Sequence, residues 1–399
     1  MSMENRTVGE CFHQIRNGAN IKQGLANGGF PITRIETTAN DTFNRDRMGY
    51  AGITDIGRYE SFILEDGDLL MSHINSVQYL GRTVLYKKQP GEVIIHGMNL
   101  LGLKANRNII LPEYARYCFY APGFREQLAK ITKKSVNQAS FTVSDLKKIV
   151  IKVPSLNEQR RTVVILDKTK ELLGYRRDEL QKLDELIKAR FVEMFGDPVT
   201  NSFGWKQALL QEVTSKIGSG ATPKGGKESY QQEGTTLIRS MNVHDGRFEY
   251  KDLAHITEEQ ARQLNNVIVE KSDVFINITG ASVARSCVVP YNVLPARVNQ
   301  HVAIIRCIQN RLHPIFANCM FLNDKFKRQL LEIGEAGGAT RQAITKQQLE
   351  ALTVILPPIE LQEQFAHFVS RLNKSTAAVQ KALDETQTLF DSLMQMYFG

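Results

Sequence analysis

Two stretches of the chain carry a seven-residue apolar period that is long enough to predict extended helices. The positions on this period are Leu166, Leu173, Leu180, Ile187 and Met194 in the first stretch and Phe365, Leu372, Val379 and Leu393 in the second. Thr386 interrupts the second series. A companion series of apolar positions accompanies it, at Phe368, Ala382, Leu389 and Met396. A sustained heptad period predicts helix–helix packing by knobs into holes. Two ordinary amphipathic helices, each packed on its own domain, are the alternative.

The two helical stretches belong to an internal repeat. Pro154 and Pro357 stand near their starts, Gly196 and Gly399 stand at their ends, and both pairs are separated by the same 203 positions. The preceding segments also correspond, since Glu65-Asp66-Gly67-Asp68 is echoed by Glu270-Lys271-Ser272-Asp273. A globular head followed by a long helix, written twice, predicts two similar heads on a rigid spacer. We therefore expect the helices to form an antiparallel pair with pseudo-twofold symmetry.

The segments before the helices have the pattern of mixed α+β domains. Short β-branched and apolar runs at residues 149–151, 302–305 and 353–355 predict strands. Thr345-Lys346-Gln347-Gln348 has the form of a capping box, and Thr142-Val143-Ser144-Asp145 stands in the equivalent place. We expect heads at 1–152 and 198–355 and spacer helices at 153–197 and 356–399.

Composition narrows the partners. The formal net charge of +8 and the pI of about 9.1 favour an anionic partner. The five cysteines show no Cys-x-x-Cys spacing, so buried free thiols are expected rather than disulfides or a zinc site. The chain has no apolar run of about 18–20 residues and no basic-then-apolar signal at its start. A cytoplasmic protein without a membrane segment is the expectation.

The search for catalytic motifs returns near misses. Residues 220–227 resemble a phosphate-binding loop, but Ala221 and Glu228 stand where Gly and Ser or Thr are needed. Glu249-Tyr250-Lys251 matches half of a nuclease motif without its Pro-Asp partner. The chain has neither the Asn-Pro-Pro-Tyr motif of an amino-methyltransferase nor a Gly-x-Gly loop suited to S-adenosylmethionine. The sequence therefore predicts a protein that is not an enzyme and has no metal site.

Taken together, these features resemble the specificity subunits of type I restriction–modification systems. The resemblance covers nearly the whole chain and rests on residues 217–223, 236–247 and 273–306, on both proline-to-Glu-Gln helix starts, and on the helix end at 191–197. The first head departs more from the family pattern. Gly18-Ala19-Asn20 replaces a Gly-Thr-Pro-like turn, and nothing answers the Gly280-Ala281-Ser282 loop. Such divergence is typical of proteins whose heads read different sequences.

The resemblance implies a role and a set of partners. Each head would be a target recognition domain that contacts one half of a bipartite site on double-stranded DNA. Two modification subunits, carrying S-adenosylmethionine and methylating adenine, would dock on the helices and heads. Restriction subunits that use ATP and Mg²⁺ could add cleavage. This chain itself would hold no cofactor.

The residues themselves offer candidates for the DNA contacts. Site-specific binding needs cations for phosphates, and amide or guanidinium groups for base edges. Such groups are concentrated in the polar loops 133–140 and 334–342 and at turn-rich positions of the second head. The candidates are Lys133, Lys134, Asn137, Gln138, Arg239, Asn277, Thr279, Arg285, Gln300, Arg341 and Gln342.

Three other functions remain open at the level of sequence. The chain could be the recognition module of a bifunctional restriction enzyme, which would bind DNA in the same way. A coiled-coil scaffold with two peptide-binding heads would differ by lacking salt-dependent DNA binding. A nuclease would reveal itself by cutting plasmid DNA in the presence of Mg²⁺.

Overall fold

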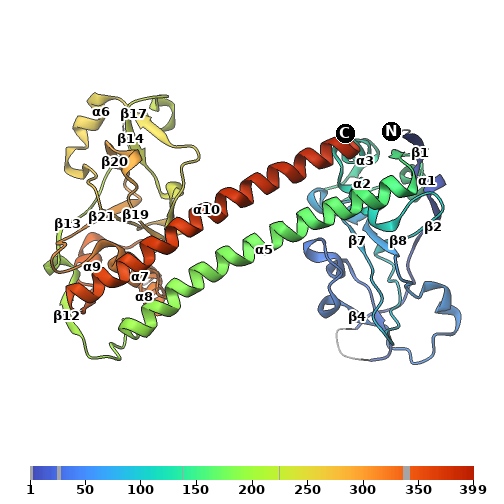
Figure 1. Ribbon diagram of the computed structural model, residues 1–399, viewed down its shortest axis with the longest axis horizontal. Helices are drawn as coiled ribbons and strands as arrows, with labels where there is room; N and C mark the ends of the chain where they lie inside the picture. The colour runs from blue at the N-terminus through green and yellow to red at the C-terminus, as the bar shows by residue number, and fades with distance from the viewer. Residues whose placement is uncertain (1–2, 25–27, 137, 224, 336–341) are drawn as a thin grey trace. The chain divides into compact units, whose positions relative to one another are not determined.

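The computed structural model describes residues 3–24, 28–136, 138–223, 225–335 and 342–399 (Figure 1). Contacts within it divide the chain into two compact units. Unit 1 comprises Met1–Arg177 and Lys381–Gly399, and unit 2 comprises Asp178–Gln380. Each unit therefore contains one head, the nearer part of its own long helix and a part of the other long helix.

The two long helices are α5 (Leu156–Phe195) and α10 (Ile359–Phe398), each of 40 residues. A helix of this length extends about 60 Å at 1.5 Å per residue. In unit 1 the start of α5 packs beside the end of α10, where Arg176 donates a hydrogen bond to the carbonyl oxygen of Ala382. In unit 2 the end of α5 packs beside the start of α10, and the rings of Phe191 and Phe365 are 5.6 Å apart. The helices therefore pack together in opposite directions, and the expected mixed α+β fold is confirmed.

The head of unit 1 is built around an antiparallel sheet in the order β2-β8-β5-β7. Its strands are β1 (Glu4–Thr7), β2 (Phe12–Asn17), β3 (Pro31–Ile32), β4 (Gly49–Tyr50), β5 (Leu69–Ser72), β6 (Ile74–Asn75), β7 (Thr83–Leu85), β8 (Leu100–Ala105), β9 (Lys133–Lys134), β10 (Ala139–Ser140) and β11 (Val150–Val153). Its helices are α1 (Val8–Cys11), α2 (Pro112–Tyr120), α3 (Pro122–Ile131) and α4 (Val143–Leu146). Strand β11 pairs with β1 and leads directly into α5.

The head of unit 2 repeats this plan around an antiparallel sheet in the order β13-β21-β18-β19, with a second sheet in the order β17-β14-β20. Its strands are β12 (Lys206–Leu209), β13 (Thr214–Ser219), β14 (Thr235–Ile238), β15 (Val243–His244), β16 (Arg247–Phe248), β17 (Ala254–Ile256), β18 (Val274–Asn277), β19 (Ser286–Val288), β20 (Ala296–Val298), β21 (Val302–Cys307) and β22 (Thr353–Leu356). Its helices are α6 (Glu258–Gln263), α7 (Pro314–Leu322), α8 (Asp324–Glu335) and α9 (Lys346–Glu350). Strand β22 pairs with β12 and leads into α10, as β11 leads into α5.

The central sheet of each head is buried on both faces. In β18, Val274 and Ile276 join the core that contains the long helices, while Phe275 between them joins the core beneath the second sheet. In β5, Leu69 and Met71 face one core and the intervening residue faces another. Side chains alternate between the faces of a strand, so burial of both faces requires an unbroken apolar run. This explains the continuous apolar sequence at residues 302–305.

A buried glutamine near the start of each long helix attaches that helix to its head. Gln159 and Gln362 are both fully buried. The Oε1 atom of Gln159 accepts a hydrogen bond from the backbone N–H of Leu111 (2.8 Å), and that of Gln362 accepts one from His313 (2.9 Å). Their amides donate to the carbonyl oxygens of Ile109 and Pro154 in unit 1 and of Arg311 and Pro357 in unit 2. The glutamine that follows Pro154 or Pro357 by five residues therefore satisfies buried backbone groups in each unit. In the second repeat this residue is Gln362, whereas Gln364 of the Glu-Gln pair is exposed.

The repeated capping motifs also have a structural role. Thr345 caps α9 with a complete capping box. The Thr345 hydroxyl accepts from the backbone N–H of Gln348, and the Gln348 side chain accepts from the backbone N–H of Thr345. Thr142 caps α4 in the equivalent place, accepting from the N–H of Asp145. Both predicted capped helices are confirmed.

The predicted heptad positions lie along the helix interface to different degrees. Leu166, Leu173 and Phe365 are buried, whereas the remaining positions are half-buried, namely Leu180, Ile187, Met194, Leu372, Val379 and Leu393. Two companion positions were predicted wrongly, since Leu389 and Met396 are 52% and 68% exposed. Thr386, which breaks the apolar period, is instead buried, and its hydroxyl donates to the carbonyl oxygen of Ala382. The apolar face of a straight helix drifts relative to a strict seven-residue repeat. Near its end, α10 also packs against the head of unit 1, so other positions than Leu389 and Met396 are buried there.

Candidate nucleic-acid interface

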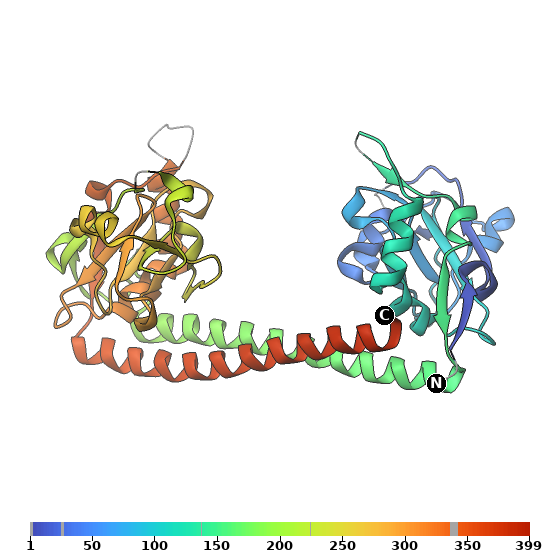
Figure 2. The same cartoon turned by 90° about the horizontal axis from the view of Figure 1, so that it is seen from above.

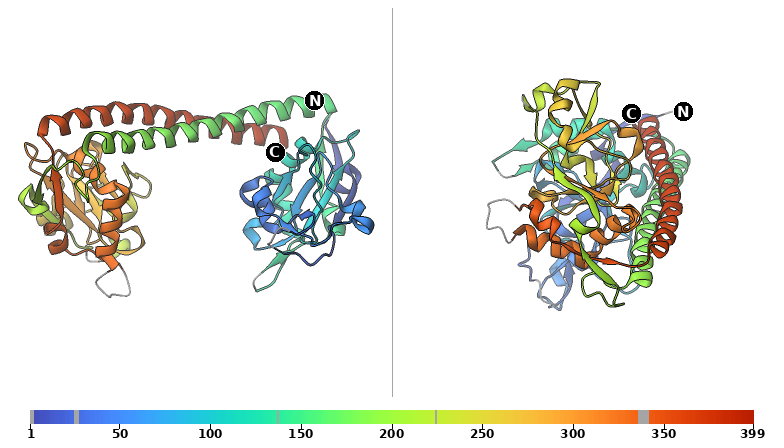
Figure 3. Two further views of the ribbon diagram at one scale, coloured as in Figure 1. Left: turned by 90° about the horizontal axis from the view of Figure 1, so that it is seen from below. Right: turned by 90° about the vertical axis from the view of Figure 1, so that its left-hand side faces the viewer.

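In unit 1, a short hairpin brings three of the predicted DNA contacts together. Strand β9 pairs with β10 so that Lys133 lies opposite Ser140 and Lys134 opposite Ala139, and β6 pairs with the other edge of β10. Lys133, Lys134 and Gln138 are all exposed. Figures 2 and 3 show this green-teal hairpin projecting from the side of the head opposite the long helices of the same unit. Asn137 lies outside the described residues.

In unit 2, backbone hydrogen bonds gather five of the predicted contacts around the end of β18. The N–H of Asn277, the last residue of β18, donates to the carbonyl oxygen of Arg285 (2.8 Å). The N–H of Gly280, next to Thr279, donates to the carbonyl oxygen of Gln342 (2.9 Å). Gln300 joins the group through its neighbour His301, whose carbonyl oxygen accepts from the N–H of Ile278 (3.0 Å). Arg341 lies outside the described residues.

Two side chains of this cluster also contact residues that are not among the predicted DNA contacts. The Thr279 hydroxyl is hydrogen-bonded to Nδ1 of His301, and the Gln300 Oε1 accepts from the hydroxyl of Thr222. Gln300 itself is exposed, and Arg285 is half-buried. The only sequence signal for Thr222 was the repeated Gly-Ala turn that contains it. His301 is one of the scattered histidines that the sequence favours as structural or nucleic-acid-facing rather than catalytic.

Two of the predicted contacts have structural roles instead. Asn277 is fully buried, and its amide donates to the carbonyl oxygen of Ser240 (2.9 Å). The expectation that its side chain contacts DNA is therefore replaced by one in which it fixes a turn. Arg239 is half-buried, donates to the carbonyl oxygen of Asp252 and lies over the ring of Tyr230 at 5.3 Å from the centroid. These contacts hold Arg239 against its own head.

In each head, an ion pair joins a strand of the central sheet to the turn that precedes the neighbouring strand. In unit 2, Arg306 forms two hydrogen bonds with the buried carboxylate of Asp273, at 2.8 and 2.9 Å. These bonds raise the pKa of Arg306. In unit 1, Lys104 lies 2.7 Å from Glu65 and 3.8 Å from Asp68, whose pKa is raised by burial. The Asp at the end of each repeated Glu-to-Asp turn also accepts from the turn's first N–H, as expected for a shared frame.

Each head has a 3-10 turn shortly after the corresponding strand of its central sheet, β18 in unit 2 and β5 in unit 1. Unit 2 forms η9 at Gly280–Ser282, and unit 1 forms η4 at Val77–Tyr79 although its sequence there is Val-Gln-Tyr. The two heads therefore share this backbone turn although their sequences there differ.

Among the residues that the structure describes, no cluster of three or more His, Cys, Asp or Glu side chains is arranged to hold a metal ion. No helix in the described part of the chain is long and apolar enough to cross a membrane.

The fold and the duplicated heads agree with a comparison against known families. Residues 2–184 and 204–386 both match the family described as "Type I restriction modification DNA specificity domain". The chain belongs to this family, and it is a specificity subunit of the type I restriction–modification class, which is non-catalytic.

Individual relatives extend this result. The chain is 26% identical to the putative type I restriction enzyme MjaX specificity subunit of Methanocaldococcus jannaschii, over 98% of this chain and 92% of the relative. It is 25% identical to the EcoKI specificity subunit of Escherichia coli over 41% of this chain and 34% of that one. The crystal structure of the type I S subunit from M. genitalium covers 100% of this chain and 96% of its own, with a TM-score of 0.62 and 15% identity. That likeness supports the fold.

Proposed function

We propose that this subunit reads a bipartite, asymmetric DNA site through two different heads. Residues 1–152 would form target recognition domain 1 and residues 198–355 domain 2, with 153–197 and 356–399 as the spacer helices. The observation that carries the proposal is that the two heads have the same buried framework but different exposed loops. Both heads share the buried glutamine and the carboxylate–cation pair, yet one presents a lysine hairpin and the other a cluster of amide and hydroxyl groups.

The chemistry of the exposed groups divides the proposed contacts into two kinds. Lys133 and Lys134 would neutralise phosphates, because an ammonium group on a solvent-exposed ribbon interacts with the backbone of any sequence. A two-stranded ribbon also fits the width of the major groove. In unit 2, Gln300, Gln342 and Arg285 have the amide and guanidinium groups that pair with base edges. Asn137 and Arg341 stay in the proposal on sequence grounds alone.

The proposed complex contains other subunits that supply the chemistry. Two modification subunits would bind S-adenosylmethionine and methylate adenine, and restriction subunits would use ATP and Mg²⁺. One of the similar solved structures, with a TM-score of 0.55 and 18% identity, concerns complex assembly and conformational transition in a type I system. By analogy the present chain would bind and position its partners, holding none of these cofactors itself.

The expected site follows from one short half-site per head. If each head reads about 3–5 bp and the half-site centres lie about one helical turn apart, an unread gap of about 5–8 bp remains. The two half-sites should differ, because the exposed loops of the heads differ. The site should therefore be neither continuous nor palindromic.

Methylome sequencing tests this function directly. A host lacking other type I systems would express the chain with its modification subunit, and adenine methylation would be located genome-wide. Exchange of residues 200–355 for the equivalent head of a relative should change one half-site and leave the other half-site and the gap unchanged. A matched exchange within residues 1–152 should change only the opposite half-site. A continuous or palindromic methylated site would contradict the proposal.

A further inference from the structure

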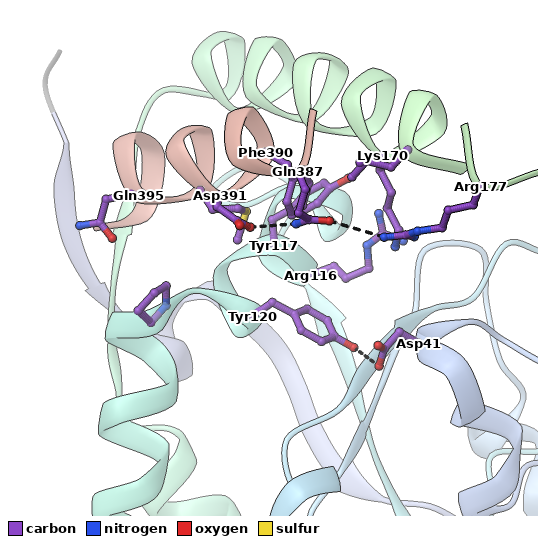
Figure 4. Close-up of a pocket in the computed structure, with 13 residues that line it drawn as sticks. Asp41, Arg116, Tyr117, Tyr120, Lys170, Arg177, Gln387, Phe390, Asp391 and Gln395 are labelled. Atoms are coloured by element: carbon purple, nitrogen blue, oxygen red, sulfur yellow. Dashed lines mark hydrogen bonds between the residues drawn. The ribbon is translucent and has the colours of Figure 1, made fainter. Parts of the chain in front are cut away.

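Unit 1 contains a cavity of about 540 Å³ where its head meets both long helices (Figure 4). Its walls come from α2, α5 and α10. Three basic side chains line it, Arg116, Lys170 and Arg177, together with two acidic ones, Asp41 and Asp391. The pocket therefore lies within a single unit and brings together charged groups that are far apart in the sequence.

The acidic groups of the pocket already have partners. Asp41 accepts a hydrogen bond from the Tyr120 hydroxyl (2.9 Å) and lies 3.1 Å from Nε of Arg82. Asp391 accepts a hydrogen bond from the amide of Gln387 (3.0 Å). Figure 4 shows both bonds as dashed lines at the pocket wall. Asp41 therefore already has a cationic partner, whereas Asp391 is held by a neutral amide.

Two of the basic groups are not balanced in this way. Arg116 pairs with Asp167 at 3.3 Å, but Arg177 has only a long contact of 3.5 Å with the side-chain Oε1 of Gln387. Within the described residues, the Lys170 ammonium has neither a hydrogen bond nor an ion pair below 4 Å. Desolvation and the nearby Arg116 charge lower the pKa of Lys170. The pocket lining thus carries one positive charge in excess, and its two basic groups without an ion pair, Lys170 and Arg177, are exposed and accessible to a partner.

The rest of the wall is apolar and aromatic. Tyr117, Leu173, Phe390 and Met394 line the same cavity. A group that fills it would therefore carry a negative charge on an apolar stem. Large apolar side chains are also exposed on the flanking helix surfaces, since Leu172, Tyr175, Leu389 and Met396 are 42%, 62%, 52% and 68% exposed. These side chains add apolar surface to the same two helices that line the pocket.

Unit 2 has no equivalent of the pocket's charges. The matching glutamine networks align α5 with α10 and α2 with α7, so the residues of the two units can be paired. In this alignment Lys170, Arg177, Arg116 and Tyr117 correspond to Asn373, Gln380, Asn318 and Cys319. Lys188 stands where unit 1 has Asp391, and it lies 3.6 Å from its helix neighbour Asp184. Among the described residues, the basic side chains that line this pocket in unit 1 are therefore replaced by neutral ones at the corresponding positions of α7 and α10 in unit 2.

We propose that the pocket receives the acidic side chain of a modification subunit that docks on unit 1, and that the two docking faces of this chain are for that reason unequal. The partner's identity rests on the proposed function. Its carboxylate lies between Lys170 and Arg177, while its methylene stem packs against Leu173 and Phe390. A second copy of the same partner meets Asn373 and Gln380 at the corresponding place on unit 2 and gains no such contact.

The test converts the pocket of unit 1 to the residues of unit 2. The K170N/R177Q variant and the wild-type chain are each titrated with the purified modification subunit, and native mass spectrometry counts the bound copies. The variant should lose affinity for one copy by about 10- to 100-fold, the effect of removing charge-assisted hydrogen bonds, and should keep the other copy. The K168N/K182Q variant removes equal charge from α5 outside the pocket lining and should assemble like wild type. The conservative variant K170R should also retain both copies.

Two results would overturn the inference, and a third concerns the proposed function. Equal affinity of K170N/R177Q and wild type for both copies would remove the pocket from assembly. Saturable thermal stabilisation of the isolated chain by glutarate, lost in K170N/R177Q with assembly unchanged, would assign the pocket to a free organic acid. If the wild-type chain bound no modification subunit but still bound DNA, the proposed function would fail before the pocket was tested.

Discussion

The two units share one frame and differ in what they present to their surroundings. In both, a buried glutamine satisfies three backbone groups at the start of the long helix, and an aromatic residue of the head packs on the end of the other helix. The Tyr114 and Phe398 rings are 5.1 Å apart in unit 1, and the Phe316 and Phe195 rings 4.7 Å apart in unit 2. The exposed loops and the charged pocket follow no such correspondence.

This difference separates the parts of the sequence that maintain the fold from those that are free to diverge. Buried polar groups tolerate little change, because each unsatisfied donor or acceptor costs about 1–3 kcal/mol. Exposed loop positions tolerate change at little cost. We therefore expect substitutions in the frame to have equal effects in both units, and substitutions in the loops and pocket to affect one unit alone.

The largest expected effect is loss of a frame glutamine. Gln159→Leu and Gln362→Leu each leave one buried N–H and two carbonyl oxygens without their side-chain partner, which should cost about 3–5 kcal/mol of unfolding free energy. The losses should be similar in the two units because the networks match. Urea unfolding followed by hydrogen exchange would measure each unit separately. Gln364→Leu, at an exposed position of α10, is the control.

Loss of an aromatic contact between head and helix should distinguish the units. Phe195 is fully buried among Phe191, Phe316 and Phe365, so Phe195→Ala should destabilise unit 2 by about 3–5 kcal/mol. Phe398→Ala should cost less, about 2 kcal/mol, because the Phe398 ring is 8% exposed and packs against fewer rings than Phe195 does, so its removal leaves a smaller buried cavity. Thermal unfolding compares the two variants. An equal or larger loss for Phe398→Ala would show that the chain end is as firmly packed as the junction between repeats.

Acid should weaken unit 1 first. Burial lowers the pKa of His96 to about 4, so its imidazole stays neutral in the fold while the unfolded chain takes up a proton below about pH 6.5. Because the unfolded state then binds more protons, stability falls as the pH drops from 6.5 to 4, by at most about 1.4 kcal/mol per pH unit.

Burial also lowers the pKa of His73, which adds to the acid sensitivity of unit 1. Burial lowers the pKa of His313 as well, which makes unit 2 acid-sensitive in the same direction and reduces the difference between the units. Hydrogen exchange measured between pH 7 and pH 4.5 should show earlier loss of protection in unit 1. The variant His96→Gln keeps a donor for the Leu100 carbonyl oxygen and should flatten the decline. Parallel loss of protection in both units would contradict the prediction.

The smallest expected effect concerns the exposed lysines. Lys133→Ala and Lys134→Ala should each reduce the salt slope of log K for DNA binding by about 0.9, and should do so for every duplex sequence. Gln300→Ala should leave that slope unchanged and weaken binding to the cognate site selectively. Fluorescence anisotropy with cognate and random duplexes at several salt concentrations measures both. Binding that does not depend on salt would rule out the phosphate contacts.

The sequence alone determined the elements whose patterns are local or repeated. The heptads gave two helices, the capping boxes gave α4 and α9, and the equal spacing of Pro154 and Pro357 gave the duplication of head and helix. Local hydrogen bonding and apolar periodicity are properties of neighbouring residues, so they are visible before folding. The family resemblance rested on the same ordered motifs.

Only the tertiary structure decided which polar residues are buried and which exposed. Asn277 and Gln300 have similar amide side chains, yet one fixes a turn inside the head and the other reaches solvent beside Thr222. Lys170 and Arg177 remain exposed, and only the packing of α2 and α10 beside α5 brings them to one pocket with Tyr117 and Phe390. Burial and pairing depend on contacts between segments far apart in the chain, and those contacts exist only once the two long helices pack against each other and against the heads.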